Sequence, residues 1–165
     1  MLFRGTPNGR FVEIDPKGGT TQALIHSSRG TAVGDIDNDG GLDLLVVNRD
    51  GPAYLLMNRV SELGNWVRFK VLLREGRDAH GALVTAIVGS NKITRRVQPE
   101  GSYLDSNDPR VHFGLSTESR IRDVEVRWPT GKTEVFGNFD AGGTVYLREG
   151  EGTVRRIDAP KPVTP

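Results

Sequence analysis

The amino-acid sequence predicts an all-β protein. Its 21 glycines and 9 prolines divide the 165 residues into short segments, and no segment keeps the apolar period of an amphipathic helix. Several segments instead alternate apolar and polar residues, as half-buried strands do. Short strands separated by Gly, Pro and Asn turns indicate a sandwich, a barrel or a propeller.

Composition excludes several classes of protein. Lys and Arg number 22 and Asp and Glu 21, for a net charge of +1, and the adjacent arginines are Arg95–Arg96 and Arg155–Arg156. A nucleic-acid-binding protein usually concentrates basic residues on one face, so we interpret these pairs as solvated strand faces. No cysteine is present, which excludes disulfides, thiolate metal sites and a cysteine nucleophile. No apolar run approaches the ~18 residues that span a bilayer, so we expect no membrane insertion.

The N-terminal region predicts three strands, at Thr31–Ile36, Leu42–Asn48 and Ala53–Asn58, whereas a propeller blade usually has four. The missing strand would leave an edge of unpaired backbone groups, which soluble proteins seldom leave long and flat. We expect the alternating segment Phe11–Ile14 to pair there, within the chain or by exchange with a second copy in a strand-exchanged homodimer. The start, Met1–Gly5, lacks the hydrophobic region of a signal peptide, so we expect a fragment of a longer chain.

The strongest chemical motif lies between the first two of these strands. Aspartates occupy the first, third, fifth and ninth positions of one loop, as Asp35, Asp37, Asp39 and Asp43. Calcium takes six to eight hard oxygen ligands, and alternate residues of a tight loop can direct carboxylates around it. Gly40 would permit the bend and the carbonyl of Gly41 would add a ligand. Close carboxylates repel one another, which favours a bound Ca2+. The predicted ligands are Asp35, Asp37, Asp39, Gly41 and Asp43.

Three other interpretations of the loop are weaker. An EF-hand requires a bidentate Glu at its twelfth position, where this chain has Val46, and strand-like residues follow rather than a helix. Magnesium prefers a few carboxylates and several waters. An ordinary Asp/Gly turn without metal is the remaining alternative.

A change in composition at Ser61–Asn65 predicts a boundary. It would separate a repeat region with the calcium loop at residues 1–60 from a second β-domain at residues 65–158, with a Pro-rich tail at residues 159–165. Strands are expected in the second region at residues 66–73, 81–89, 111–115, 123–128, 132–136 and 144–149. The aromatic core residues expected for a β-sandwich are Trp66, Phe69, Phe113 and Trp128, with an aromatic sugar-binding platform as the alternative.

Other polar residues carry less information. The three histidines, His26, His80 and His112, have no zinc-site or triad spacing, and we interpret His112 as a packed or hydrogen-bonded structural residue. The segment Asp105–Asp108 could offer oxygens to a second ion, but an Asx-type turn before Pro109 explains it more simply.

Two known families resemble successive parts of the chain. Residues 30–58 resemble an FG-GAP (VCBS-type) repeat, a blade of integrin-like propellers, through Gly34–Gly40, Leu42–Leu44, Asn48 and Leu55–Asn58. That resemblance implies calcium binding by the loop aspartates. From Asn65 onward the chain is similar to the ASPIC/UnbV domain of the cartilage acidic protein family. The matching segments are Asn65–Trp66, Asp78–Ala82, Gly101–Leu104, Val111–Leu115 and Val126–Gly131.

The resemblances imply partial β-propeller blades followed by a β-sandwich-like domain, in a protein that is extracellular, at the cell surface or periplasmic. We predict a calcium-binding, non-catalytic interaction or adhesion module that binds an unidentified protein or glycan, and no nucleic acid. A structural cap of a repeat array is one alternative. An enzyme such as a glycosidase with a carboxylate pair is another. No nucleophile–base spacing supports it, and the clustered carboxylates are accounted for as metal ligands.

Overall fold

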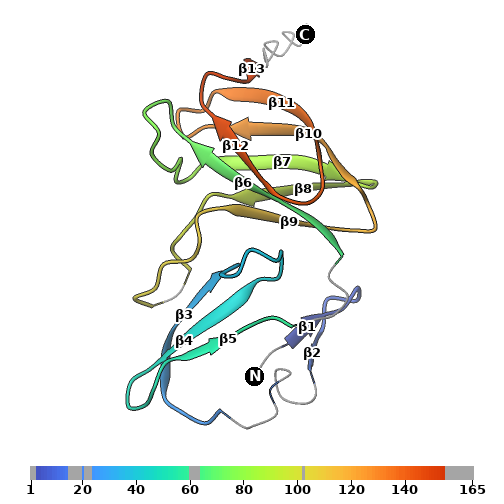
Figure 1. Ribbon diagram of the computed structural model, residues 1–165. Coiled ribbons are helices and arrows are strands. Elements are labelled where there is room, and N and C mark those ends of the chain that lie inside the picture. The colour runs from blue at the N-terminus through green and yellow to red at the C-terminus, as the bar shows by residue number, and fades with distance from the viewer. Residues whose placement is uncertain (1–2, 15–19, 21–23, 60–63, 102, 155–165) are drawn as a thin grey trace, which may run out of the picture.

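The computed structural model describes residues 3–14, 20, 24–59, 64–101 and 103–154. Within these ranges all regular secondary structure is β-strand, arranged in four sheets (Figure 1), so the expected all-β class is confirmed. The described residues include no helix long and apolar enough to cross a membrane. Most of the predicted boundary at Ser61–Asn65 and the predicted tail at residues 159–165 lie outside the described residues.

The N-terminal segment forms a hairpin of its own. Strand β1 (Phe3–Gly5) pairs with β2 (Phe11–Glu13) in antiparallel register. The connecting turn is closed by the bonds Thr6 N–Arg10 O, at 2.9 Å, and Gly9 N–Thr6 O, at 3.0 Å. The expectation that Phe11–Ile14 pairs within the chain with the following sheet is therefore wrong. A local turn closes at lower entropic cost than a pairing across a long intervening segment, which explains the difference.

The next sheet contains the three strands that the sequence predicts. Strands β3 (Ser28–Gly34), β4 (Asp43–Asn48) and β5 (Tyr54–Leu56) pair antiparallel in sequence order. The first pairing ends at Gly34 opposite Asp43, so residues 35–42 form the connecting loop. The aspartate motif therefore occupies one end of this sheet.

The C-terminal region is a sandwich of two sheets. The larger has the order β13-β11-β10-β7-β8 and comprises β7 (Leu83–Val88), β8 (Asn91–Arg96), β10 (Arg120–Arg127), β11 (Thr133–Asp140) and β13 (Thr153–Val154). The smaller has the order β12-β6-β9 and comprises β6 (Asn65–Leu72), β9 (Val111–Ser116) and β12 (Thr144–Arg148). Strand β12 runs parallel to β6, and the other pairings are antiparallel.

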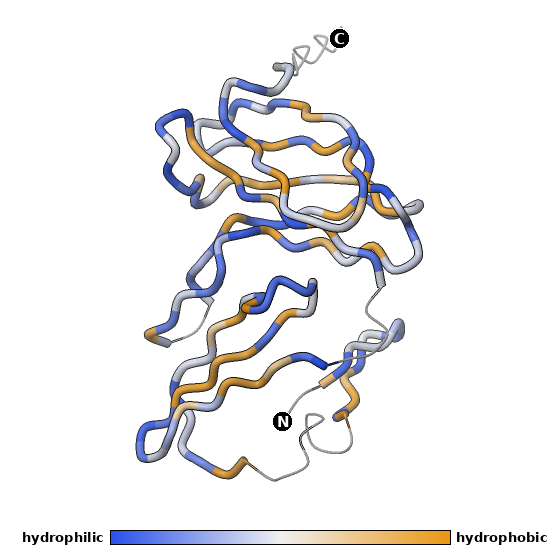
Figure 2. Tube along the Cα trace, viewed as in Figure 1, coloured by the Kyte–Doolittle hydropathy of each residue, from blue (hydrophilic) through white to orange (hydrophobic). Residues whose placement is uncertain are grey.

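The hydrophobic core lies between these two sheets. Alternate residues of β6, β9, β7 and β10 are buried, and apolar residues recur along the strands of both sheets in Figure 2. Phe69 packs edge-on against Phe113 at 5.7 Å between ring centroids, and Trp128 packs against Phe136 at 6.3 Å. Three of the four aromatic residues expected in the core are therefore there, and their burial excludes them from a sugar-binding platform.

Trp66 is the exception. Because side chains alternate across a strand, Trp66 shares a face with Arg68 and Lys70, opposite the core face of Phe69. The interpretation of Trp66 as a core residue is therefore wrong. Its face is turned toward the loop between β3 and β4.

The edge strand β13 is held by a buried carboxylate. Glu134 on β11 is fully buried, with Lys132 Nζ 2.8 Å from one carboxylate oxygen and the amide of Gly150 donating to the other at 2.9 Å. Burial alone would raise the pKa of Glu134, but the bonds from Lys132 and from the amides of Gly150 and Gly152 outweigh it and lower the pKa.

Glu134→Gln is therefore expected to cost about 1–3 kcal/mol of unfolding free energy at pH 7. A carboxyl with a depressed folded-state pKa stabilises the fold above its ordinary value of 4.5, and this contribution is lost as the pH falls below that value. The variant should therefore approach the wild type in stability at acid pH. Urea titrations at both pH values measure this, with the exposed Glu151→Gln as control. Equal stability of Glu134→Gln and wild type at pH 7 would refute it.

Candidate metal centre

The loop between β3 and β4 folds around the carboxylate of Asp35. This side chain is only 2% exposed, and its two oxygens accept the backbone N–H groups of Asp39, at 3.1 Å, and Gly40, at 2.8 Å. Gly40 has φ +97°, in the region that favours glycine, so the loop can turn back at this point. The bend predicted at Gly40 is confirmed.

Three of the predicted ligands lie together. One carboxylate oxygen from each of Asp35, Asp37 and Asp39 lies within 4.8 Å of the others. Asp35 is buried beneath the group, whereas Asp37 and Asp39 are exposed. This arrangement gives an accessible cluster of hard oxygen donors at the end of the sheet.

The other two predicted ligands are placed differently. The carboxylate of Asp43 is 1% exposed and accepts the amides of Ile36 and Asn58, each at 2.8 Å. It lies outside the three-carboxylate cluster, although each of its oxygens retains a second lone pair. Gly41 donates its amide to Asp39 at 2.7 Å. Coordination by Asp43 and by the Gly41 carbonyl remains a prediction.

A buried arginine from the sandwich neutralises Asp35. Arg68 on β6 is 3% exposed, and its Nη1 lies 2.8 Å from Asp35 Oδ2. Its Nη2 donates to the side-chain oxygen of Asn38 at 3.2 Å, and Arg110 Nη1 donates to the same oxygen at 3.0 Å. The loop is therefore held against the outer face of the β12-β6-β9 sheet by two guanidinium groups.

Ring packing completes this contact. A Cβ built on Gly40 would lie 1.9 Å from Trp66 Nε1, so the indole occupies the space that any other residue would need. His112 stacks on Trp66 at 6.1 Å between centroids and donates Nε2–H to the carbonyl of Gly40 at 2.9 Å. The interpretation of His112 as a hydrogen-bonded residue is confirmed.

The charges around His112 favour its neutral form. Burial lowers its pKa most, the bond to Gly40 opposes this, and the positive charges of Arg68 and Arg95 lower the pKa further. The other two histidines, His26 and His80, are exposed. The structure therefore brings no second histidine to this site among the residues it describes.

The net charge of the loop fits a divalent cation. Of the four aspartates at residues 35–43, Asp35 pairs with Arg68, and Asp37 pairs with Arg59, whose Nη1 lies 3.1 Å from Asp37 Oδ2. The third guanidinium at the loop, that of Arg110, is paired with Asp108. Two negative charges therefore remain, on Asp39 and Asp43, for which the described residues provide no ion pair. Carboxylate and carbonyl oxygens are the donors that calcium prefers. The donor set and the charge therefore fit Ca2+. Repulsion among the carboxylates is a weaker argument for an ion than the sequence suggests, because the arginines relieve part of that repulsion.

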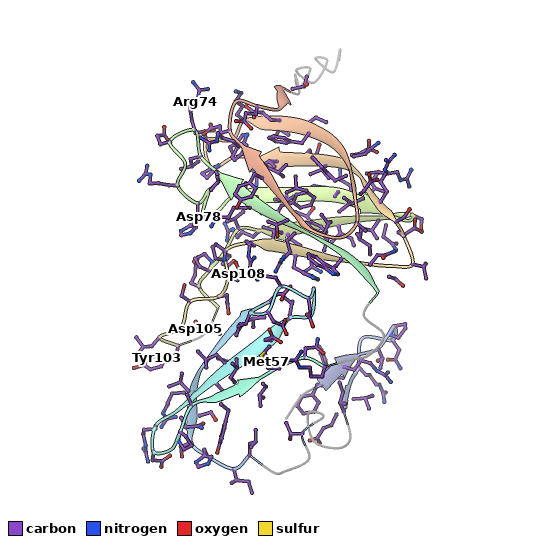
Figure 3. The ribbon with its side chains drawn as sticks, viewed as in Figure 1. Met57, Arg74, Asp78, Tyr103, Asp105 and Asp108 are labelled. Carbon is purple, nitrogen blue, oxygen red and sulfur yellow. The ribbon has the colours of Figure 1, made fainter. Side chains whose placement is uncertain are left out.

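The second candidate segment has a structural role. Asp108 accepts the amide of Arg110 at 2.9 Å and its Nε at 2.6 Å, in the Asx-type geometry that the sequence favours. Burial would raise the pKa of Asp108, but these bonds lower it. Asp108 N and Asn107 Oδ1 also bond the backbone of Val33, so this loop is attached to β3. Figure 3 labels Asp105 and Asp108 on this loop.

The residues that sequence reasoning missed are those of the sandwich face, above all Arg68, Arg110 and Trp66. No local signal distinguished Arg68, because a charged residue between Val67 and Phe69 fits the alternation of a half-buried strand, as Lys70 does on the same face. Its partner Asp35 is 33 residues away, so local patterns do not identify the contact.

Comparison with known proteins identifies the sandwich. Residues 73–154 match the family described as ASPIC and UnbV. This part of the chain is an ASPIC/UnbV domain. The match begins directly after β6, yet β6 is the central strand of the sheet that also contains β9 and β12 of the ASPIC/UnbV domain. The strand that carries Arg68 therefore precedes the matched range but is part of the same sandwich.

The chain is also homologous to cartilage acidic protein 1. It is 36% identical over 116 residues to the Homo sapiens protein, 34% over 116 residues to that of Mus musculus and 33% over 120 residues to that of Xenopus tropicalis. These alignments cover 67%, 67% and 70% of this chain, in the same order, but only 17%, 18% and 18% of the relatives. The chain thus spans less than a fifth of their length.

Proposed function

We propose that this chain is a calcium-binding, non-catalytic interaction module that works outside the cytoplasm and binds a protein or glycan. The observation that carries the proposal is the convergence of Asp35, Asp37 and Asp39 on a loop with two uncompensated negative charges. A bound ion would be held by these carboxylates, by the Gly41 carbonyl and by Asp43.

Calcium would act on the contact between the sheet and the ASPIC/UnbV sandwich. Asp35 binds Arg68, and Gly40 contacts Trp66 and His112, so the same loop carries the proposed ligands and the contact with β6 and β9. An ion that binds only the folded loop stabilises this arrangement by mass action. The module would then present a stiffened surface to its partner.

We further propose that β3, β4 and β5 are a blade of FG-GAP type. Leu45 and Leu55 are paired across β4 and β5 and are 39% and 49% exposed, and Val47 on the same face is 48% exposed. A repeat unit that stacks against a neighbouring unit would show such an apolar face. The exposed face favours an array of blades. A capping role for the sandwich, the alternative function, is compatible with such an array.

An extracellular location and a non-catalytic role are proposed for this chain by analogy with its relatives and from the contacts of His112. The relatives are named for cartilage and for acidic character, and an extracellular place for this chain is the matching proposal. Within the described residues, His112 donates to a backbone carbonyl rather than bonding a nucleophile. The contact of His112 supports the proposal of binding rather than turnover.

Calcium titration of the metal-stripped chain by calorimetry tests the proposal. We expect one site with a dissociation constant between ~1 μM and ~1 mM, the range of sensor and extracellular sites. Asp37→Ala should weaken binding strongly, since it removes an exposed ligand while leaving the buried Asp35–Arg68 pair in place. Asp50→Ala, at an exposed aspartate in the β4–β5 turn, is the matched control and should bind as the wild type does. No heat at millimolar calcium would refute the proposal.

A further inference from the structure

A cavity of about 220 Å³ opens between the end of β3 and the sandwich. It is lined on the sandwich side by residues of β8, β9 and the loop before β9, and by Arg68 of β6. A cavity holds one water from roughly 10–15 Å³ upward, so this one admits a ligand of several atoms.

The lining of the cavity is strongly basic. Arg68, Arg95, Arg96 and Arg110 all contribute to it, and the one carboxylate among its lining residues belongs to Asp108. Asp108 is paired with Arg110 at 2.6 Å, and Arg68 is paired with Asp35. Within the part of the chain that the structure describes, Arg95 and Arg96 form no ion pair. Two positive charges at the cavity are therefore uncompensated.

Arg68 also has an unused donor. Its Nη1 and Nη2 bond Asp35 and Asn38, but its buried Nε has no acceptor among the described residues. A buried N–H without an acceptor is costly, and the guanidinium presents its donors in a rigid fork that suits oxyanions.

We propose that this cavity binds an oxyanion, a sulfate or carboxylate group, with Arg95 as the principal ligand and Arg68 and Arg110 as supporting charges. The side chain of Arg96 leaves β8 on the opposite face from that of Arg95, which lies 5.5 Å from the centroid of the Phe113 ring, so Arg96 adds to the positive field only. Planar guanidiniums recognise such groups through paired, charge-assisted hydrogen bonds. The anion is either free or carried by an acidic glycan. Binding of an acidic glycan would deepen the proposed interaction function and rests on it. Neither the free nor the glycan-borne anion requires calcium at the aspartate loop.

Nuclear magnetic resonance titration of the full chain in the presence of a chelator tests this assignment. Sodium sulfate and a sulfated glycosaminoglycan disaccharide are the two probes. We expect both to shift the amide signals of Arg95, Arg96 and Arg110 and the Nε–H signal of Arg68. Tighter binding of the disaccharide identifies a glycan-borne anion, and equal binding identifies a free one.

Variants make the test specific. Arg95→Gln, on an exposed edge strand, should weaken binding at least about tenfold, as expected for a bond between charged groups, whereas Arg96→Gln, on the opposite face of β8, should weaken it less. Arg120→Gln removes the same charge from an exposed position bonded to Asp140, and its binding should match the wild type. The proposal is overturned if neither probe shifts the cavity signals, or if Arg95→Gln binds as well as Arg120→Gln does. Because the chelator removes calcium, this result is independent of the calcium titration.

Discussion

Replacing Arg68 with methionine is expected to destabilise the protein by about 3–5 kcal/mol, the cost of leaving one member of a buried ion pair without its partner. Arg68 and Asp35 are both almost fully buried, and the guanidinium also lies 4.7 Å above the ring of Trp66. Methionine fills much of the volume but leaves the Asp35 carboxylate with backbone amides alone. Urea denaturation measures the loss.

Two controls separate the buried pair from a general effect of charge. Lys70→Met removes a cation two residues along the same strand face, whose pair with Asp78 is partly exposed, and should cost about 1 kcal/mol or less. In the double variant Arg68→Met/Asp35→Asn the two costs should not add, because the second change removes the uncompensated charge. A cost for Arg68→Met no larger than that for Lys70→Met would contradict the role assigned to this pair.

Gly40→Ala is expected to cost roughly 2–5 kcal/mol. A side chain at a positive φ costs about 1–2 kcal/mol, and overpacking adds typically 1–3 kcal/mol. Here the new Cβ would lie within 2.3 Å of three atoms of the Trp66 indole, so the loop must move away from β6. Since the same loop carries the proposed ligands, calcium affinity should fall together with stability.

The chain provides a matched control for the cost of placing a side chain at a positive φ. Gly76 has φ +86°, but a Cβ there would meet nothing within 4 Å. Gly76→Ala should therefore cost only about 1–2 kcal/mol, and the excess in Gly40→Ala measures the clash. A Trp66→Ala background should remove that excess. Equal destabilisation by the two glycine variants would show that Trp66 does not hold the loop.

Alternation of apolar residues was enough to predict most of the fold. In β6 it places Val67, Phe69 and Val71 in the core, and in β10 it does the same for Val124 and Val126. The same rule places Trp66 on the opposite face, and its assignment to the core failed because aromatic character was given more weight than position. Strand β8 was not predicted because Ile93 is the only apolar residue in Asn91–Arg96.

Contacts between residues far apart in the chain could not be predicted from the sequence. The parallel register of β12 with β6 joins Thr144 to Arg68, and no local pattern encodes such a contact. The candidate site shows the same limit. The spacing of the aspartates predicted the loop and its bend at Gly40, but the guanidiniums that pair with its carboxylates are those of Arg68 on β6 and Arg59 after β5. Asp43 has the predicted spacing, yet the amides of Ile36 and Asn58 hold its carboxylate outside the cluster.

Sensitised terbium luminescence tests the central claim, that the loop docked on β6 is a calcium site, most directly. Terbium takes oxygen ligands as calcium does and emits when a tryptophan in close contact is excited. Of the two tryptophans, Trp66 contacts Gly40 in the loop and Trp128 is buried in the core. We predict emission that calcium displaces, that Trp66→Phe and Asp37→Ala each abolish and that Trp128→Phe retains. No sensitised emission from the wild type, or emission that survives both Trp66→Phe and Asp37→Ala, would contradict the account.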